Sequence, residues 1–395
     1  MNGKDVWHKS GSSGRPQRVF NRASLKRKTL KNLRLVRKRV VRLGKWFKRA
    51  SLKERILEDL VMRRVKRWTV HLSARHLHGP KEIAYAPDEL VVVCLVRDGR
   101  PYIKSFIDHY LSLGAKHIVF LDNGSSDDTV AVAREHERVT LIRSTLPFKK
   151  YEFAMKEYLI SRFGKGRWSL YVDVDELFDY PYSDVVSLSS LLRYLNERSY
   201  TAVAAQMLDM FSDRAMRSRI SQEDEVLKEL YRFYDLSNIK SNHYNSSNNV
   251  VANESIKKYR DGIRKYLFDV PFVLTKHPLM YFDGEAKHKN NDNGLHGIRN
   301  ARIADFSCVL YHYKLVDGFR ERAVQAAREE NYALATLHYK KYQEVLERNP
   351  DIKVRRDTAQ ELGSVNELII NGFLVVSEEY WKWADAEKRA RAAWS

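Results

Sequence analysis

The distribution of apolar and polar residues changes near residue 88. From there on, short continuous apolar runs alternate with stretches whose apolar residues recur every three or four positions. The first pattern is typical of buried strands and the second of amphipathic helices. It predicts strands at 90–96, 117–121, 139–143 and 168–172, separated by helices at 101–113, 127–137 and 150–163. Strands and helices in this order predict an α/β fold with a mostly parallel sheet flanked by helices.

The pattern becomes less regular after residue 172. It predicts a helix at 188–196 and a strand at 202–211, then short strands at 272–274 and 308–313. The segment 237–253 is rich in Asn and Ser, which predicts a mobile loop or an insertion on the acceptor side. A helical pattern over 318–347 and an apolar segment at 368–376 predict a helical C-terminal extension.

Charge divides the chain at about the same place. Residues 1–86 contain 25 Lys and Arg against 5 Asp and Glu, whereas the remaining residues contain 45 of each kind. The segment 21–70 mixes basic with regularly spaced apolar residues and predicts one or two helices, and 71–87 predicts a linker. We therefore expect three parts: a basic arm and linker over 1–86, a neutral α/β body over 87–315, and the extension over 316–395.

The arm is open to three interpretations. Lys and Arg on one helix face, with Leu43, Trp46 and Phe47 among the apolar residues, favour a helix lying on an anionic membrane surface over residues 21–70. The alternatives are a solvated arm that packs on the body or a partner, and a nucleic-acid-binding arm, which the neutral charge of the body does not favour.

Several features suggest a cellular location. The chain has no apolar run near the ~20 residues that a membrane-spanning helix needs, and its N-terminus is polar rather than leader-like. Its two cysteines, Cys94 and Cys308, lie in apolar runs and exclude a disulfide scaffold. We expect a cytoplasmic protein that binds peripherally to the inner face of the cytoplasmic membrane.

Acidic residues follow three of the predicted parallel strands. Asp98, Asp122 and the pair Asp173 and Asp175 come at strand ends, where open parallel sheets bind ligands. Clustered carboxylates need a cation, and their hard oxygens suit Mg²⁺ or Mn²⁺. Two glycine-rich motifs commonly bind phosphate in parallel sheets, G-x-G-x-x-G and G-x-x-x-x-G-K-S/T. Neither follows the first predicted strand. A site of this kind most simply holds a diphosphate through a metal ion.

Two segments carry a resemblance to a known family. They read LVVVCLVRDGRPYIKSFIDHYLSLGAKHIVFLDNGSSDDT and RWSLYVDVDELFDY. The chain resembles the family 2 glycosyltransferases of GT-A fold, on a branch similar to family 92 and to bacterial surface-polysaccharide transferases. The resemblance covers roughly 88–315, with weaker similarity in LIINGFLVVSEEYWKWA.

The resemblance implies roles for particular residues. Asp98, with Arg97 beside it in the same turn, and Asp122 would contact the nucleotide. Asp175 would bind Mn²⁺ or Mg²⁺ on the donor diphosphate, with Asp173 near the sugar or ribose. Two residues late in the chain would complete the site: His312 as a metal ligand and Lys314 at the diphosphate.

The catalytic base is not identified by the resemblance, because the family's usual acidic motif is not evident after Phe211. An inverting displacement needs a group that takes the proton from the acceptor hydroxyl. The candidates are Asp209, Asp283 and Glu285. His277 and His296 are either acceptor-site groups or loop residues.

The sequence thus predicts an inverting, metal-dependent glycosyltransferase of hexosyltransferase type. It would move a sugar from a nucleotide-sugar donor to a glycan or lipid-linked acceptor in cell-surface polysaccharide or lipopolysaccharide synthesis. One alternative is a nucleotidyltransferase on a related fold, although LVRDGRP offers little to hold a triphosphate. The other is a nucleic-acid-binding protein that acts through the basic arm.

Overall fold

The computed structural model describes residues 52–215, 226–244, 248–288, 296–329, 335–350 and 352–394. The expected insertion of Leu43, Trp46 and Phe47 into a membrane, and most of the predicted arm, fall outside these ranges. Residues 63–395 form one compact unit that is separate from 1–62.

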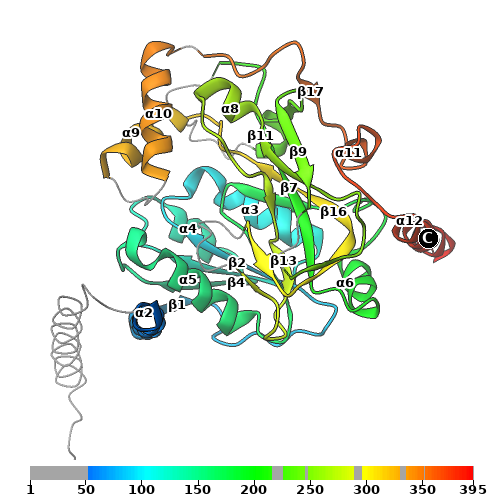
Figure 1. Cartoon of the computed structure of the whole chain (residues 1–395), viewed down its shortest axis with the longest axis horizontal. Helices are drawn as coiled ribbons and strands as arrows, with labels where there is room; N and C mark the ends of the chain where they lie inside the picture. Colours follow the sequence, from blue (N-terminus) through cyan, green and yellow to red (C-terminus); the bar gives the residue numbers. More distant parts are fainter. Residues whose placement is uncertain are drawn as a thin grey trace, which may run out of the picture. The chain divides into compact units, whose positions relative to one another are not determined.

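The centre of this unit is a large mixed sheet (Figure 1). Its strands follow the order β1-β4-β3-β2-β5-β13-β7-β16-β10. Strands β2, β3, β4 and β5 are mutually parallel, and β7 and β16 run in the same direction, because β13 is antiparallel to both β5 and β7. The carboxyl ends of these six strands therefore meet at one edge of the sheet. Their bounds are β2 Val91–Val96, β3 His117–Asp122, β4 Val139–Arg143, β5 Trp168–Tyr171, β7 Ala202–Asp209 and β16 Arg302–His312.

Shorter strands complete the sheet or form small ribbons beside it. In the main sheet β1 pairs with β4, β6 with β16, β12 with β7, and β10 with β16. The bounds of the main-sheet strands are β1 Arg75–His78, β6 Glu176–Asp179, β10 Val250–Val251, β12 Thr275–Lys276 and β13 Leu279–Tyr281. The ribbon strands are β8 Phe233–Tyr234, β9 Ile239–His243, β11 Lys257–Asp261, β14 Lys287–His288, β15 Ile298–Arg299 and β17 Gln360–Glu361.

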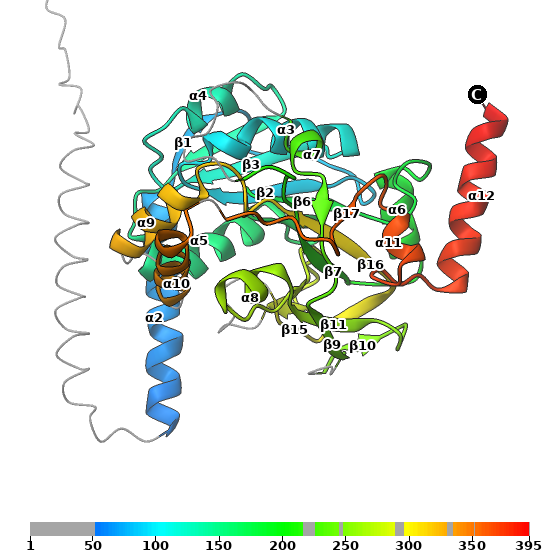
Figure 2. The same cartoon turned by 90° about the horizontal axis from the view of Figure 1, so that it is seen from above.

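Helices cover both faces of the parallel part (Figure 2). Helices α3 (Arg100–Leu113) and α4 (Thr129–Arg134) pack on one face, and α5 (Phe148–Phe163) packs on the other, together with the end of α2 (Leu52–Ser73). The α3 pattern explains its position, because Ile103, Phe106 and Tyr110 recur every three or four residues and are fully buried. Gly114 ends the helix in the left-handed conformation that glycine favours, at φ 104°.

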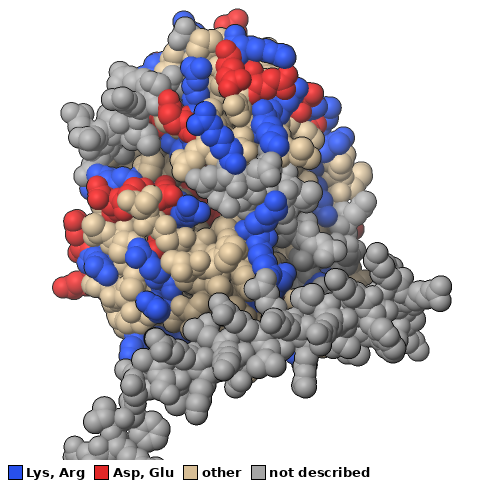
Figure 3. Space-filling view, turned by 90° about the vertical axis from the view of Figure 1, so that its left-hand side faces the viewer, with Lys and Arg blue, Asp and Glu red and all other residues tan. Residues whose placement is uncertain are grey.

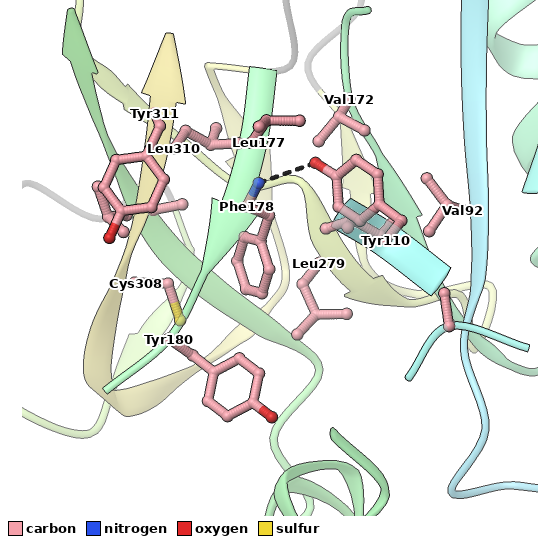
Figure 4. Close-up of a cluster of buried hydrophobic side chains, with 14 of the residues drawn as sticks. Val92, Tyr110, Val172, Leu177, Phe178, Tyr180, Leu279, Cys308, Leu310 and Tyr311 are labelled. Carbon is pink, nitrogen blue, oxygen red and sulfur yellow. Dashed lines mark hydrogen bonds between the residues drawn. The ribbon is translucent and has the colours of Figure 1, made fainter. Parts of the chain in front are cut away.

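Side chains from distant segments form the main core (Figure 4). The Tyr110 hydroxyl lies within it and accepts a hydrogen bond of 2.8 Å from Phe178 N. The same hydroxyl donates to Glu176 O at 2.9 Å. One side chain of α3 thus holds the first residues of β6, which directly follow the acidic turn after β5.

The helices after residue 180 pack around the rest of the compact unit. Helices α9 and α10 form a pair that packs with α8, and α12 is anchored by Tyr380, which stacks on Phe306 with ring centres 4.0 Å apart. Their bounds are α6 Leu188–Glu197, α7 Leu227–Leu230, α8 Ile263–Phe268, α9 Phe319–Glu329, α10 Ala335–Arg348, α11 Glu367–Ile370 and α12 Glu378–Trp394. On the face in Figure 3, positive and negative side chains are interspersed, as the balanced charge of residues 87–395 leads one to expect.

The predicted fold class is confirmed, and the four early strands lie within two residues of their predicted bounds. Three predictions differ from the structure. The segment 237–253 contains β9 and β10 rather than only a loop, and the stretch 71–87 includes the end of α2 and the edge strand β1. The short strand predicted at 272–274 lies instead at Thr275–Lys276, as β12. Each segment takes its structure from pairing or packing with distant residues, which local patterns do not reveal.

Candidate functional site

A cleft of about 400 Å³ lies at the carboxyl ends of the parallel strands. Its lining includes Arg97, Asp98, Asp173, Asp175 and His312, which come from the ends of β2, β5 and β16. Helices α5, α9 and α10 supply further lining side chains. The cleft has the size of an ordinary small-molecule site, and it lies where open parallel sheets bind ligands.

Asp98 occupies the turn after β2 with a backbone φ of 50°. Its carboxylate accepts hydrogen bonds from Ser126 N at 2.7 Å and Ser126 Oγ at 3.1 Å, while its own N–H donates to Ser125 Oγ at 2.9 Å. This φ lies in the left-handed region, which Asp adopts more readily than most other residues. These bonds to the turn after β3 fix Asp98 at the cleft wall, with Arg97 adjacent.

Asp122 does not line the cleft, contrary to the prediction that it contacts the nucleotide directly. Its side chain is fully buried and binds Arg143, whose Nε lies 2.6 Å from Oδ2. It also accepts hydrogen bonds from Gly124 N and Ser125 N. Asp122 therefore stabilises the turn that holds Asp98. It can affect ligand binding only indirectly, through the position of that turn.

Asp173 lies among cations. Lys276 Nζ is 3.1 Å from its Oδ2 and 2.5 Å from Glu176 Oε1. Burial alone would raise the pKa of Asp173, but Lys276 and Lys156 outweigh burial and lower the pKa to about 2. Burial also raises the pKa of Glu176, and there Lys276 does not fully compensate. Asp173 is thus an ionised carboxylate at any physiological pH.

Asp175 faces the late strand β16. Its Oδ2 is 3.6 Å from His312 Nε2 and 3.4 Å from Lys314 Nζ. Burial acts to raise the pKa of Asp175, but Lys314 and His312 outweigh it and hold the pKa well below its usual value. Three predicted site residues, Asp175, His312 and Lys314, are therefore brought together, although Asp175 lies more than 130 residues before the other two in the sequence.

His312 lies between two carboxylates. Its Nδ1 is 2.5 Å from Asp209 Oδ1, and Asp209 Oδ2 binds Arg264 Nε at 2.8 Å. Burial and Arg264 act to lower the pKa of His312, but Asp175 and Asp209 outweigh them and raise it. Both oxygens of Asp209 are thus engaged, and the side chain is buried. This arrangement argues against the predicted role of Asp209 as a catalytic base.

The residues present fit a hard divalent cation. Two ligands that each lie about 2.1 Å from one ion are themselves about 3–4 Å apart, and Asp175 Oδ2 and His312 Nε2 have this separation. Metal-binding histidines usually donate their other ring N–H to a carboxylate, as His312 can to Asp209. Within the described ranges no group of three His, Cys, Asp or Glu side chains encloses a metal position. The remaining ligands of an ion would then come from a diphosphate and water.

Asp283 and Glu285 lie at the wrong end of the sheet for the predicted role as base. Tyr281 pairs with Trp168, the first residue of β5, whereas Asp173 follows the last residue of that strand. At about 3.3 Å per residue, Asp283 is roughly 20 Å from Asp173. Its carboxylate instead accepts hydrogen bonds from Glu285 N and Ala286 N within its own turn. Both residues are exposed.

His296 lines the cleft, and His277 lies behind it. His296 Nδ1 is 3.1 Å from Thr275 O and must donate, because a carbonyl cannot. The neutral ring then presents Nε2 as an acceptor. Burial and the neighbouring Lys276 lower the pKa of His296 to about 3. Of His277 and His296, His296 is the one that lines the cleft.

Other cleft residues have no motif and were missed in the sequence. They include Lys156, Lys276 and Arg264, which are buried and charged, and Tyr171 and Glu152. One signal was available for Lys156: it lies on the apolar face of its helix, beside the buried residues Met155 and Leu159. Lys276 and Arg264 lie in segments without periodicity, and only the tertiary structure brings them to the cleft.

Comparison with protein-family models and with curated proteins finds no match. Comparison with solved structures finds local similarity to TarS from Staphylococcus aureus, with a TM-score of 0.24 and 16% identity over 32% of this chain and 24% of that one. The others include the Mycobacterium tuberculosis glucosyl-3-phosphoglycerate synthase bound to Mn²⁺, UDP and glucosyl-3-phosphoglycerate, with a TM-score of 0.22 and 14% identity over 34% and 52%.

A third similar structure is the mannosyltransferase PcManGT from Pyrobaculum calidifontis in complex with GDP-mannose and Mn²⁺. Its TM-score is 0.23, with 19% identity over 36% of this chain and 42% of that one. The chain thus spans between a quarter and about half of these three structures.

Proposed function

We propose that this chain is a metal-dependent glycosyltransferase that takes a nucleotide-sugar donor. The observation that carries the proposal is the pairing of Asp175 with His312, backed by Asp209, in a cleft that also contains Asp98. This arrangement supports a site that holds a diphosphate through a cation at one end and a nucleoside at the other. The recurrence of Mn²⁺ with UDP or GDP-mannose in two of the similar structures is consistent with that choice of ligand.

Each end of the donor has residues suited to it. Asp98 and Arg97 would hold the nucleoside beside the turn that Asp122 stabilises. Asp175 and His312 would bind Mn²⁺ or Mg²⁺, which when bound neutralises the charge that develops on the leaving diphosphate. Lys314, 3.4 Å from Asp175, would contact the same diphosphate directly.

The displacement also needs a proton acceptor, and we assign this role to His296, which lines the cleft. Its Nε2 is left as an acceptor by the bond from Nδ1 to Thr275 O. The acceptor hydroxyl would give its proton to Nε2 as its oxygen forms a bond to the anomeric carbon and the bond to the diphosphate breaks. Negative charge on the bound donor opposes the effect of Lys276 and makes His296 a stronger base. Reaction from the face opposite the diphosphate inverts the anomeric centre.

The acceptor proposed is a glycan or lipid-linked glycan of the cell surface, reached from the cytoplasmic face of the membrane. The described part of α2 supports attachment there, because Leu60, Trp68 and Leu72 are more than half exposed on a helix rich in Lys and Arg. In the described ranges, no helix has the length and apolar character needed to cross a bilayer. We propose that this attachment is peripheral.

The direct test is hydrolysis of UDP-, GDP- and CMP-sugars by the full chain in the presence of Mn²⁺. We expect turnover of at least one donor and its loss in Asp175→Asn. Absence of binding to every nucleotide-sugar would refute the proposed function.

A further inference from the structure

Tyr171 lines the cleft, and its buried hydroxyl has no hydrogen-bond partner among the described residues. Tyr171 is the last residue of β5 and its side chain is only 3% exposed. No hydrogen bond to its hydroxyl is present in the described part of the chain, although buried polar groups are almost always satisfied. A missing partner inside a ligand-sized cleft indicates that a bound molecule supplies it.

The charged side chains near Tyr171 include two from α5, Lys156 and Glu152. Lys156 Nζ lies 5.5 Å from the centre of the Tyr171 ring and 2.8 Å from Glu152 Oε1. Burial acts to lower the pKa of Lys156, but Asp173 and Glu152 outweigh it and raise the pKa, so the ammonium stays charged. Tyr171, Lys156 and Glu152 all line the cleft, and we call them the α5 pocket.

The position of the α5 pocket relates it to the proposed donor. Tyr171 and Asp173 both lie near Lys156, which is 5.5 Å from the centre of the Tyr171 ring and helps to lower the pKa of Asp173. Asp175, the proposed metal ligand, follows two residues later. In a nucleotide-sugar the sugar is attached directly to the diphosphate, so a diphosphate held at Asp175 places its sugar next to this pocket.

The chemistry of the α5 pocket suits hydroxyl groups. Tyr171 can donate and accept hydrogen bonds, Lys156 donates them and Glu152 accepts them. A sugar hydroxyl can form a hydrogen bond with each of these groups. A phosphate or carboxylate would meet Glu152, Asp173 and the buried Glu176, with Lys156 and Lys276 already paired to them. We propose that Tyr171, Lys156 and Glu152 bind hydroxyls of the transferred sugar and select a neutral sugar. The inference rests on the proposed function, and it adds the class of sugar and the residues that bind it.

The test compares nucleotides with and without their sugar. Binding of UDP, GDP, UDP-glucose, UDP-N-acetylglucosamine and GDP-mannose is measured by calorimetry with Mn²⁺, on the full chain and on Tyr171→Phe. Loss of one hydrogen bond predicts that Tyr171→Phe binds the preferred nucleotide-sugar roughly 3- to 10-fold more weakly. Binding of UDP or GDP alone should change by less than about twofold, because neither reaches the α5 pocket.

Glu152→Gln tests the charge preference separately. The full chain should bind UDP-glucuronic acid more weakly than UDP-glucose, and this discrimination should shrink in Glu152→Gln. Thermal unfolding of both variants shows whether they fold, and Tyr171→Phe should be at least as stable as the parent because its hydroxyl has no hydrogen-bond partner in the described part of the chain.

The outcomes are distinguishable. Equal effects of Tyr171→Phe on sugar-free and sugar-bearing nucleotides, or no effect on either, would overturn the inference and leave the proposed function standing. So would a parent chain that prefers UDP-glucuronic acid. Failure of all five nucleotides to bind the parent chain would overturn the proposed function and the inference with it.

Discussion

His312 and Asp209 end two neighbouring parallel strands at the same level, and their side chains meet with Nδ1 2.5 Å from Oδ1. The register of β7 and β16 fixes this contact, because the two residues are paired in the ladder. The contact makes Nδ1 the donor and leaves Nε2 facing Asp175. A rigid sheet thus orients one ligand of the proposed metal, with no contribution from a loop.

Replacement of Asp209 tests this orienting role. We expect Asp209→Asn to weaken Mn²⁺ binding by about 10- to 100-fold while the affinity for metal-free nucleotide changes little. The measurement is a Mn²⁺ titration followed by calorimetry or electron paramagnetic resonance. Because Arg264 would lose a buried partner, the variant should also unfold more easily by about 3–5 kcal/mol. Unaltered Mn²⁺ affinity in a folded variant would show that Asp209 does not position the ligand.

His296 should govern turnover more than donor binding. Replacement by Gln removes the proposed base and is expected to lower kcat by about 100- to 10,000-fold, with a similar KM for the donor. Steady-state kinetics with a glycan acceptor provides the measurement. Asp283→Asn is the matched control: it changes a carboxylate roughly 20 Å from Asp173 and should keep kcat within about twofold. A large loss in the control and none in His296→Gln would contradict the role of His296 and restore Asp283 as a candidate base.

His109 makes the stability of the fold sensitive to acid. It is buried on α3, and its Nε2 lies 2.7 Å from Phe178 O, to which the neutral ring donates. Burial lowers the pKa of His109 to about 3, below its value of 6.5 in an unfolded chain. Between these two pH values His109 is protonated in the unfolded state but neutral in the folded state. The stability that depends on neutral His109 is therefore fully present above pH 6.5 and is lost as the pH falls toward 3.

The magnitude of that loss is measurable by urea unfolding at several pH values. One pKa unit corresponds to about 1.4 kcal/mol, so the parent should lose about 2–3 kcal/mol between pH 6 and pH 4 from this group alone. His109→Gln keeps a donor for Phe178 O but cannot titrate, and it should lack this component. Parallel pH profiles for the two proteins would contradict the prediction.

Attachment to membranes should depend on the basic N-terminal segment. Residues 1–51 contain 17 Lys and Arg and one Asp, and each cation near an anionic surface contributes about 1 kcal/mol. We expect the full chain to float with phosphatidylglycerol vesicles at 0.1 M salt and to be released at 1 M, where the screening length falls to about 3 Å. A chain lacking 1–51 should bind much more weakly, and Trp68→Ser should weaken what remains.

The position of the truncation follows from the structure. Residues 63–86 belong to the compact unit, in which Val70 and Tyr85 are buried and β1 pairs with β4. Removal of 1–86 would therefore expose core, whereas removal of 1–51 should leave donor hydrolysis intact. Equal flotation of the full and shortened chains would assign the charge of the segment to RNA or a protein partner instead.

The sequence predicted the parts of this site that follow continuous apolar strands. The ends of β2 and β5 could be located because their cores are unbroken apolar runs, and so Asp98, Asp173 and Asp175 were placed correctly at the cleft. Asp122 follows the same rule but is turned away, because Arg143 on the neighbouring strand binds it. The position of Asp122 at a strand end does not predict that Arg143 binds it.

The remaining differences have one physical cause. Asp209, Asp283 and Glu285 could not be ranked as bases because their surroundings depend on pairings across the sheet, such as those of β13 with β5 and of β16 with β7. The same holds for Lys276, at the end of the two-residue strand β12, and for His296, which lies outside the helices and strands. Local periodicity describes a strand or a helix face, but it does not describe which distant strand lies beside it.

The most direct test of the account is Mn²⁺-dependent hydrolysis of nucleotide-sugars by the parent chain, Asp175→Asn and the control Asp108→Asn. Asp108 is an exposed carboxylate on α3 that pairs with Lys104 and does not line the cleft. The account predicts hydrolysis of at least one UDP-, GDP- or CMP-sugar by the parent and by Asp108→Asn, abolished by EDTA and by Asp175→Asn. Hydrolysis that persists unchanged in Asp175→Asn, or no binding of any nucleotide-sugar to the parent, would contradict it.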